Sequence, residues 1–262
     1  MIKNRFGRIW PACAILILAS LACISISPAK ETPAPTSTSA PTSLPTATVL
    51  PTATTIPTPT PNATATQEVL DLQKQIQGYV SSGYLPSANG TLYSLKDNSL
   101  DLAQRNFLDF FDSGYKDTVK DFAAWGDVNW STDGPVSMPA YSGCGFSFHF
   151  KGNGDAYTAL LTNDRVLLTW CFSGLGNRCG AIGKTRGAGR LGYSSPAKAH
   201  FELIVNDIHA YVLVDGQFTG EYTLFDDKLT NPGYFVYTIV SGTNHGYGTH
   251  CEIANAQLWV PK

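Results

Sequence analysis

The N-terminal part of this 262-residue sequence lacks the residues that build a folded core. Its first 66 residues contain no aromatic residue beyond Phe6 and Trp10, and all twelve tyrosines lie from Tyr79 onward. A segment with so few large apolar side chains cannot bury enough surface to offset the entropy lost on folding. We therefore expect the folded part after residue 66, where about 180 residues suffice for one self-sufficient domain.

Basic residues are scarce in that folded part. From Gln67 onward there are 14 Lys and Arg against 19 Asp and Glu, a net charge of −5 (14 − 19). The one basic cluster, Lys184, Arg186 and Arg190, lies in a glycine-rich stretch and is typical of a solvated turn. A nucleic-acid partner requires Lys and Arg clustered along the phosphate backbone, so we expect none.

Signatures of catalysis and of cofactor binding are also missing. The sequence has no nucleophile elbow, no His-Glu-x-x-His helix and no dinucleotide fingerprint. His245, His250 and Cys251 carry the ligand types of a zinc site, but a cysteine in an exported domain more readily pairs with another cysteine. We expect no cofactor and no metal, and no residue is assigned as catalytic.

A signal for export stands at the N-terminus. Three basic residues within residues 1–8 precede an uncharged, largely apolar stretch from Ile9 to Ala29. Within it, Ser20-Leu21-Ala22-Cys23 resembles the bacterial lipobox, although Leu stands one position later than the family prefers. We predict that residues 1–23 are a lipoprotein signal and anchor, with lipid on Cys23 at the extracytoplasmic face of a bacterial envelope. Cleavage without lipidation and an uncleaved membrane-spanning anchor remain alternatives.

Between the anchor and the domain the sequence predicts a linker and a helix. Residues 24–66 are almost wholly Pro, Thr, Ser and Ala, which is typical of a disordered stalk. After this linker, Val69, Leu72, Ile76 and Tyr79 recur at spacings of 3, 4 and 3. This period predicts one short helix over residues 67–80.

Downstream, over residues 81–262, the apolar period changes to two. Cys144, Phe146, Phe148 and Phe150 alternate with smaller or polar residues, which predicts a strand with one face in a core. The denser run 165–170 predicts a strand buried on both faces, and the mixed pattern over 100–122 predicts an irregular helix or a long loop. Many short strands separated by turn residues predict an all-β sandwich or barrel.

Two groups of segments carry a resemblance to known folds. The run 211–217 looks like the strand and turn of concanavalin A-like and laminin-G-like jelly rolls. Residues 142–148, together with 241–244 and 246–252, are similar to a domain that ends many Pro/Thr-stalked bacterial lipoproteins, over about residues 78–260. The resemblance implies an antiparallel jelly-roll β-sandwich at 81–262. Since the activity of those relatives is generally unassigned, it implies a fold more than a function.

Four cysteines remain in the exported domain, and their even number favours disulfides. Three pairings are possible. Cys171 and Cys179 are eight residues apart across a glycine-containing loop that is able to close on itself, and this leaves Cys144 with Cys251. We predict these two bridges.

Glycan binding is the function that we expect first. Sugars stack on exposed aromatic faces, and several aromatic residues lie near predicted strand ends and loops. The candidate ligand-binding residues are Trp125, Trp130, Tyr141, Tyr157 and Tyr193. The expected partners are thus a polysaccharide or cell-surface glycan, and a membrane through the N-terminal lipid or helix.

Two other functions are left open. One is a structural or adhesive envelope domain without a small ligand. The other is a sugar-active hydrolase of the same fold, which would need two carboxylates in one cleft. The glucanase motif Glu-x-Asp-x-x-Glu is absent, and Glu202, Glu221 and Glu252 lie on separate predicted strands.

Overall fold

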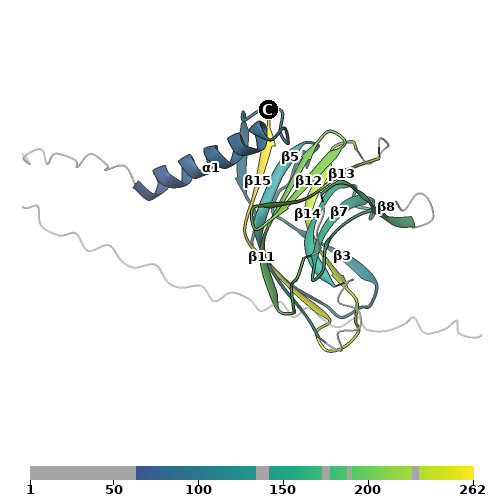
Figure 1. Ribbon diagram of the computed structural model, residues 1–262. Helices are drawn as coiled ribbons and strands as arrows, with labels where there is room; N and C mark the ends of the chain where they lie inside the picture. The colour runs from purple at the N-terminus through teal and green to yellow at the C-terminus, as the bar shows by residue number, and fades with distance from the viewer. Residues whose placement is uncertain (1–62, 134–141, 173–177, 188–190, 226–229) are drawn as a thin grey trace, which may run out of the picture. The chain divides into compact units, whose positions relative to one another are not determined.

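The protein is described by a computed structural model over residues 63–133, 142–172, 178–187, 191–225 and 230–262. These residues form one helix and fifteen strands, and the strands make two antiparallel sheets, sheet A and sheet B. Figure 1 shows the helix beside sheet A, and sheet B on the other side of sheet A. The predicted all-β sandwich is confirmed.

Sheet A has eight strands, and its C-terminal strand β15 lies between β1 and β5 in the pairing order. The path through the sheet is β1 (Gly90–Ser94), β15 (Thr249–Pro261), β5 (Phe122–Thr132), β11 (Ala197–Asn206), β12 (His209–Val214), β13 (Gln217–Thr223) and β10 (Lys184–Arg186). Strand β2 (Asn98–Leu102) also pairs with β15.

Sheet B has seven strands. Its path is β3 (Phe107–Asp112), β14 (Gly233–Ser241), β6 (Gly143–Phe150), β7 (Ala156–Thr162), β8 (Val166–Phe172) and β9 (Arg178–Ile182). Strand β4 (Thr118–Val119) pairs with β14 as well. We call the face of each sheet that points toward the other sheet its inner face, and the opposite one its outer face.

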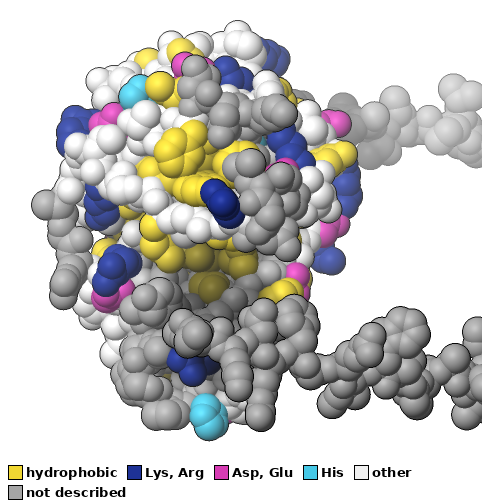
Figure 2. Space-filling model, turned by 90° about the vertical axis from the view of Figure 1, so that its right-hand side faces the viewer, with side chains coloured by type: hydrophobic (Ala, Val, Ile, Leu, Met, Phe, Trp, Pro, Cys, Tyr) yellow, Lys and Arg dark blue, Asp and Glu magenta, His cyan; other side chains and the backbone are white. Residues whose placement is uncertain are grey.

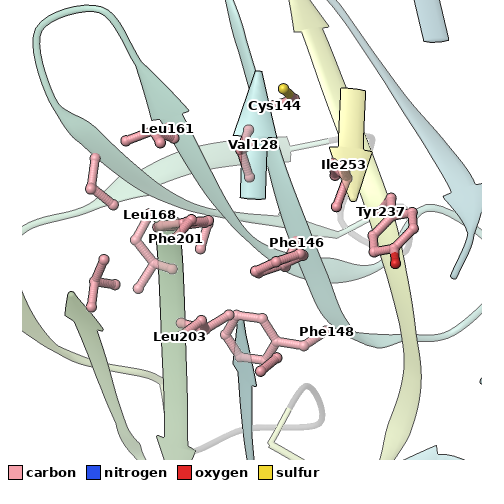
Figure 3. Close-up of a cluster of buried hydrophobic side chains, with 14 of the residues drawn as sticks. Val128, Cys144, Phe146, Phe148, Leu161, Leu168, Phe201, Leu203, Tyr237 and Ile253 are labelled. Atoms are coloured by element: carbon pink, nitrogen blue, oxygen red, sulfur yellow. The ribbon is translucent and has the colours of Figure 1, made fainter. Parts of the chain in front are cut away.

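The main core lies between the two inner faces. Alternate residues of each strand point into it, as the period of two predicts. Phe146 of β6 stacks on Phe201 of β11 with ring centroids 5.3 Å apart. Figure 3 shows further side chains that meet there from both sheets: Val128, Leu203 and Ile253 from sheet A, and Phe148, Leu161, Leu168 and Tyr237 from sheet B.

Both predicted disulfides are confirmed. Cys144 of β6 and Cys251 of β15 join the two sheets inside the core, with Cα atoms 6.0 Å apart. Cys171 and Cys179 are directly paired residues of β8 and β9, with Cα atoms 4.1 Å apart. Both bridges fit an exported domain, because disulfides persist in oxidising compartments.

Helix α1 (Ala63–Ser81) covers the outer face of sheet A. The predicted helix is confirmed, but it starts four residues before the predicted Gln67 (67 − 63). Its apolar stripe, with Ile76 and Tyr79 buried and Leu72 half-buried, packs on side chains of β5, β11 and β12. The hydroxyl of Tyr79 donates a hydrogen bond to the buried carboxylate of Glu202 on β11. An amphipathic helix of this kind is stable because its apolar stripe finds an apolar sheet face.

Two predictions about strands are wrong. The segment 100–122 is neither a helix nor one long loop, because it contains part of β2 and all of β3 and β4. The run 165–170 is not buried on both faces, since Val166 and Leu168 are buried whereas Leu167 and Thr169 are only half-buried. In both cases the position of the segment in the sheet determines whether it forms a strand and how deeply its side chains are buried. Local composition does not reveal this position.

The predicted anchor at 1–23, including Cys23, lies outside the described residues, as does the linker as far as residue 62. The last four residues of the predicted linker, 63–66, belong to α1. Within the part of the chain that the structure describes, no helix is both long and apolar enough to span a membrane.

Candidate functional site

Three of the five aromatic residues predicted to bind a ligand are buried. Trp125 lies under α1 on the outer face of sheet A and is 5% exposed. Trp130 and Tyr157 are fully buried in the core between the sheets. None of the three can stack on a sugar, so the predicted aromatic surface does not form at these positions. The physical reason is that Trp130 and Tyr157 point to the inner faces of the two sheets, and that Trp125 points to the outer face that α1 covers.

Of the remaining two candidates, the structure describes only Tyr193. Tyr141 lies outside the described residues. Tyr193 is half-buried, its ring meets Trp130 edge-on at 5.3 Å, and its hydroxyl donates a 2.6 Å hydrogen bond to Asp215. Its ring and its hydroxyl therefore both have partners within the domain.

The structure instead places an aromatic groove on the outer face of sheet B. It has a volume of about 550 Å³ and is formed where β3, β14 and β6 lie side by side. We define the aromatic groove by five of its lining residues: Phe110, Phe150, Tyr234, Asp112 and Lys116. Figure 2 shows this side of the molecule, where hydrophobic side chains gather around a hollow.

A β-bulge at His149 turns Phe150 into this groove. His149 has a φ of 52°, and the pairing of β6 with β14 shifts there, because Tyr234 pairs with Phe150 whereas Val236 pairs with Ser147. Over this interval β14 advances two residues and β6 three (236 − 234 and 150 − 147), so the extra residue reverses the alternation of faces. The prediction that Phe150 lies in the core with Phe146 and Phe148 is wrong for this reason.

Phe110 reaches the groove through ordinary strand alternation. In β3, Phe111 pairs with the buried Tyr237 and Phe110 pairs with Thr238, so the two adjacent rings point to opposite faces. The Phe110 and Phe150 rings stack across β14 with centroids 4.7 Å apart and an interplanar angle of 28°. Tyr234 pairs with Phe150 across β14 and β6 and is 46% exposed.

Charged side chains form the rim of the groove. Lys116 makes an ion pair with Asp112, whose other oxygen accepts a 2.9 Å hydrogen bond from the backbone N–H of Gly114. The hydrogen bond from Lys116 holds the pKa of Asp112 below its usual value, so the carboxylate is charged at neutral pH. Asp109 precedes Phe110 in β3, so strand alternation places its side chain on the other face of the strand, and its carboxylate accepts a 2.9 Å hydrogen bond from the N–H of Phe110.

A lysine holds the segment that leads to Tyr234. The ammonium of Lys151 donates 2.8 Å hydrogen bonds to the carbonyls of Asn231 and Pro232. Burial lowers the pKa of Lys151, and the two carbonyls accept from two of its three N–H groups. These bonds tie the start of β14 to the end of β6, and so fix Tyr234 relative to Phe150.

The three glutamates considered for hydrolysis lie outside this groove, on three strands of sheet A. Glu202 is buried under α1, Glu221 pairs with Arg186 and His209, and Glu252 lies near His250. Cys251 is in a disulfide, so the zinc site at His245, His250 and Cys251 does not form. In the described ranges, no group of three or more His, Cys, Asp or Glu side chains is placed to hold a metal ion.

No protein-family model matches the chain, and no curated protein matches it. Solved structures that align with it include the carbohydrate-binding module CBM66 from Bacillus subtilis, with a TM-score of 0.43, 14% identity, and coverage of 63% of this chain and 94% of that chain. Fructan 1-exohydrolase IIa from Cichorium intybus aligns with a TM-score of 0.38 and 9% identity over 66% of this chain, which spans only 35% of that enzyme. Sheep galectin-11 in complex with glycerol aligns with a TM-score of 0.32 and 7% identity, covering 59% of this chain and 98% of that chain. Since all three TM-scores are below 0.5, these likenesses assign no function to the chain.

Proposed function

We propose that this chain is an envelope-tethered surface lipoprotein whose concanavalin A-like β-sandwich binds a glycan in the aromatic groove, without catalysing a reaction. The observation that carries the proposal is the stacked pair Phe110 and Phe150 with the exposed Tyr234 beside a charged rim.

This combination suits a sugar ring. A pyranose has apolar C–H faces and polar hydroxyls at its edge, so it binds best where an aromatic platform and hydrogen-bonding groups meet. For pairs of aromatic side chains, stacking contributes about 0.5–1.5 kcal/mol beyond the contribution of the buried area, and we use this value by analogy for a sugar ring on an aromatic face. The groove volume of about 550 Å³ also falls in the range of about 300–1,000 Å³ that is usual for small-ligand sites.

The expected tether adds to the binding. A single shallow groove gives weak affinity, because it covers only part of an oligosaccharide. If the chain is lipidated at Cys23, many copies lie on one surface and engage the same polymer. The effective concentration then raises the overall avidity without any new contact.

A glycosidase needs two facing carboxylates, whereas among the described residues the carboxylate placed at the groove is that of Asp112, which is paired with Lys116; this arrangement favours binding over hydrolysis. The structural alternative, an adhesive domain without a small ligand, requires instead that the aromatic groove stay empty. One experiment separates binding from this alternative.

The experiment uses the full chain, exported and oxidised, on a glycan array and on insoluble polysaccharides. We expect retention that falls at least tenfold in Phe110→Ala and in Tyr234→Ala. Tyr247→Ala is the matched control, because Tyr247 is a tyrosine of similar exposure, 41%, in the connection before β15. Equal retention of Tyr234→Ala and Tyr247→Ala, or no retention of the folded wild type on any glycan, would contradict the proposal.

The tether is tested separately. Cells that express the full chain are labelled with a radioactive fatty acid, and Cys23→Ala is compared with the wild type. We expect label only in the wild type; label of equal strength in both would exclude lipidation at Cys23.

A further inference from the structure

A second pair of aromatic side chains adjoins the aromatic groove. Tyr115 lines the groove from the connection between β3 and β4, and its ring meets the ring of Tyr93 with centroids 5.0 Å apart and an interplanar angle of 68°. Tyr93 belongs to β1, which stands at one end of the strand order of sheet A, and it is 37% exposed. The aromatic surface of the groove therefore continues past the edge of sheet B to the edge of sheet A.

The tyrosine hydroxyls along this surface are available to a ligand. Within the described ranges, the hydroxyls of Tyr234, Tyr115 and Tyr93 make no hydrogen bond, whereas the hydroxyl of Tyr193 is already used by Asp215. A phenolic hydroxyl can both donate and accept, as a sugar hydroxyl does. Each of the three tyrosines can thus offer a hydrogen bond in addition to its ring.

The extended surface is longer than one sugar ring. The groove is built across β6, β14 and β3, and the outer two of these strands lie about 10 Å apart, because neighbouring strands in a sheet are separated by about 4.8 Å. The pair of Tyr115 and Tyr93 adds a ring separation of 5.0 Å at the β3 side of the groove. A single pyranose ring covers only part of this length.

Backbone contacts fix the two parts of this surface relative to each other. The N–H of Lys96, two residues after β1, donates a 2.8 Å hydrogen bond to the carbonyl of Ser113, which follows β3. Ser113 is fully buried, and its hydroxyl donates a 2.6 Å hydrogen bond to the carbonyl of Phe235 on β14. The segment after β1 is thereby joined to the strands that carry the groove. A ligand that contacts both parts needs little further ordering of the protein.

We infer that Tyr115 and Tyr93 form a second sugar-binding subsite, and that the aromatic groove binds several consecutive units of a linear polysaccharide instead of a single terminal sugar. The inference rests on the proposed function and names the class of its ligand. Phe110, Phe150 and Tyr234 contact one unit of the chain, and Tyr115 and Tyr93 contact a later unit. Because each subsite adds aromatic contact and hydrogen bonds, the affinity increases with chain length until both subsites are filled.

Tyr93→Ala is the informative substitution. Tyr93 is the exposed member of its pair, whereas Tyr115 is half-buried and packs against the main core. Removing the Tyr93 ring should therefore weaken only the second subsite. Tyr93→Phe keeps the ring beside Tyr115 and removes only the hydroxyl, so it should lose less affinity. The control is again Tyr247→Ala, in which a tyrosine of 41% exposure outside the groove is removed.

The test measures the affinity of the full oxidised chain for oligosaccharides of increasing length by isothermal titration calorimetry. The probes are cello-, laminari- and malto-oligosaccharides from the disaccharide to the hexasaccharide, together with fragments of the same lengths from any other polysaccharide that the array selects. A site for two units can hold a hexasaccharide in five positions, so a single subsite pair of that size gives at most about a fivefold statistical gain.

For at least one series we expect the wild type to bind the hexasaccharide more than tenfold more tightly than the disaccharide. In Tyr93→Ala this gain should fall to about fivefold or less, while the affinity for the disaccharide stays within twofold of the wild type. Tyr234→Ala should weaken the binding of both lengths, and Tyr247→Ala should behave as the wild type does.

The outcomes separate this inference from the proposed function. A wild-type gain of tenfold or less overturns the inference and leaves glycan binding intact. A Tyr93→Ala variant that keeps the wild-type gain also overturns it, and an equal loss at both lengths would mean that the Tyr93 ring only supports the fold of the groove. If no glycan binds to the folded wild type, both the inference and the proposed function fail.

Discussion

The two outer faces of the sandwich differ in whether a helix covers them. The outer face of sheet A carries Trp125 and Tyr211, and both are buried where α1 packs on that sheet. The outer face of sheet B carries Phe110 and Tyr234, which line an open groove. Both faces are rich in aromatic side chains, so the number of aromatic residues does not identify a binding surface. What distinguishes the faces is that one has a covering element with a matching apolar stripe.

The comparison predicts opposite consequences for aromatic substitutions on the two faces. Trp125→Ala should lower the free energy of unfolding by about 3–5 kcal/mol, because it opens a cavity between α1 and sheet A. Tyr234→Ala should change it by less than about 0.5 kcal/mol, because its ring is half exposed. Urea unfolding of the oxidised chain measures both values. A loss below about 1 kcal/mol for Trp125→Ala would mean that α1 does not protect this face.

The polar contact beneath α1 gives a smaller effect. Glu202 is 6% exposed, and the hydroxyl of Tyr79 is the hydrogen-bond donor that reaches its carboxylate. Tyr79→Phe should cost about 1–3 kcal/mol, since it leaves a buried acceptor unsatisfied. Glu202→Gln should cost less, because the amide oxygen still accepts from Tyr79. If the two variants unfold at the same urea concentration as the wild type, the helix is not held by this contact.

A histidine at the uncovered end of the outer face of sheet A should make the free energy of unfolding weakly dependent on pH. A hydrogen bond to Asp101 raises the pKa of His250, against the effect of burial, and Glu252 lies 3.4 Å from its other ring nitrogen. Because the folded-state pKa is above the unfolded value of about 6.5, the stabilisation is complete below pH 6.5 and is lost as the pH rises through the folded value. His250 is 34% exposed, so the effect should stay below about 1 kcal/mol.

The measurement is the change in the free energy of unfolding between pH 5.5 and pH 8.5, compared between the wild type and His250→Gln. We expect the wild type to lose more stability than the variant as the pH rises. An identical change in both proteins, or a larger loss in His250→Gln, would contradict the sign of this prediction.

The features that could be predicted from the sequence are those that a core imposes locally. The alternation around Phe146 and the helical spacing of Ile76 and Tyr79 arise because each element needs one apolar face. The disulfide pairing followed from a short loop that can close on itself and from the even number of cysteines. These signals depend on neighbours in the chain, and the sequence displays them directly.

The aromatic groove could not be predicted in the same way, because it depends on a strand pairing. The bulge at His149 lies where Gly233 of β14 approaches so closely that a Cβ there would come within 2.3 Å of the His149 carbonyl carbon. Only the paired strands reveal that Phe150 changes face as a result. One signal was available in Phe110 and Phe111, since two adjacent aromatic residues in one strand must point to opposite faces.

The burial of Trp125 shows the complementary difficulty. Its position near a predicted strand end suggested exposure, but its environment is made by α1, which lies more than forty residues earlier in the sequence (125 − 81 = 44). Contacts between distant segments decide which face of a sheet is free, and a single sequence does not list such contacts.

The central claim is that the ligand binds to the outer face of sheet B, and it is tested most directly by NMR of the full oxidised chain during titration with a glycan that the array selects. We predict that the aromatic ring signals of Phe110, Phe150 and Tyr234 shift, while those of Trp125 under α1 remain unchanged. Shifts centred on Trp125 and α1, with an unperturbed groove, would contradict this account.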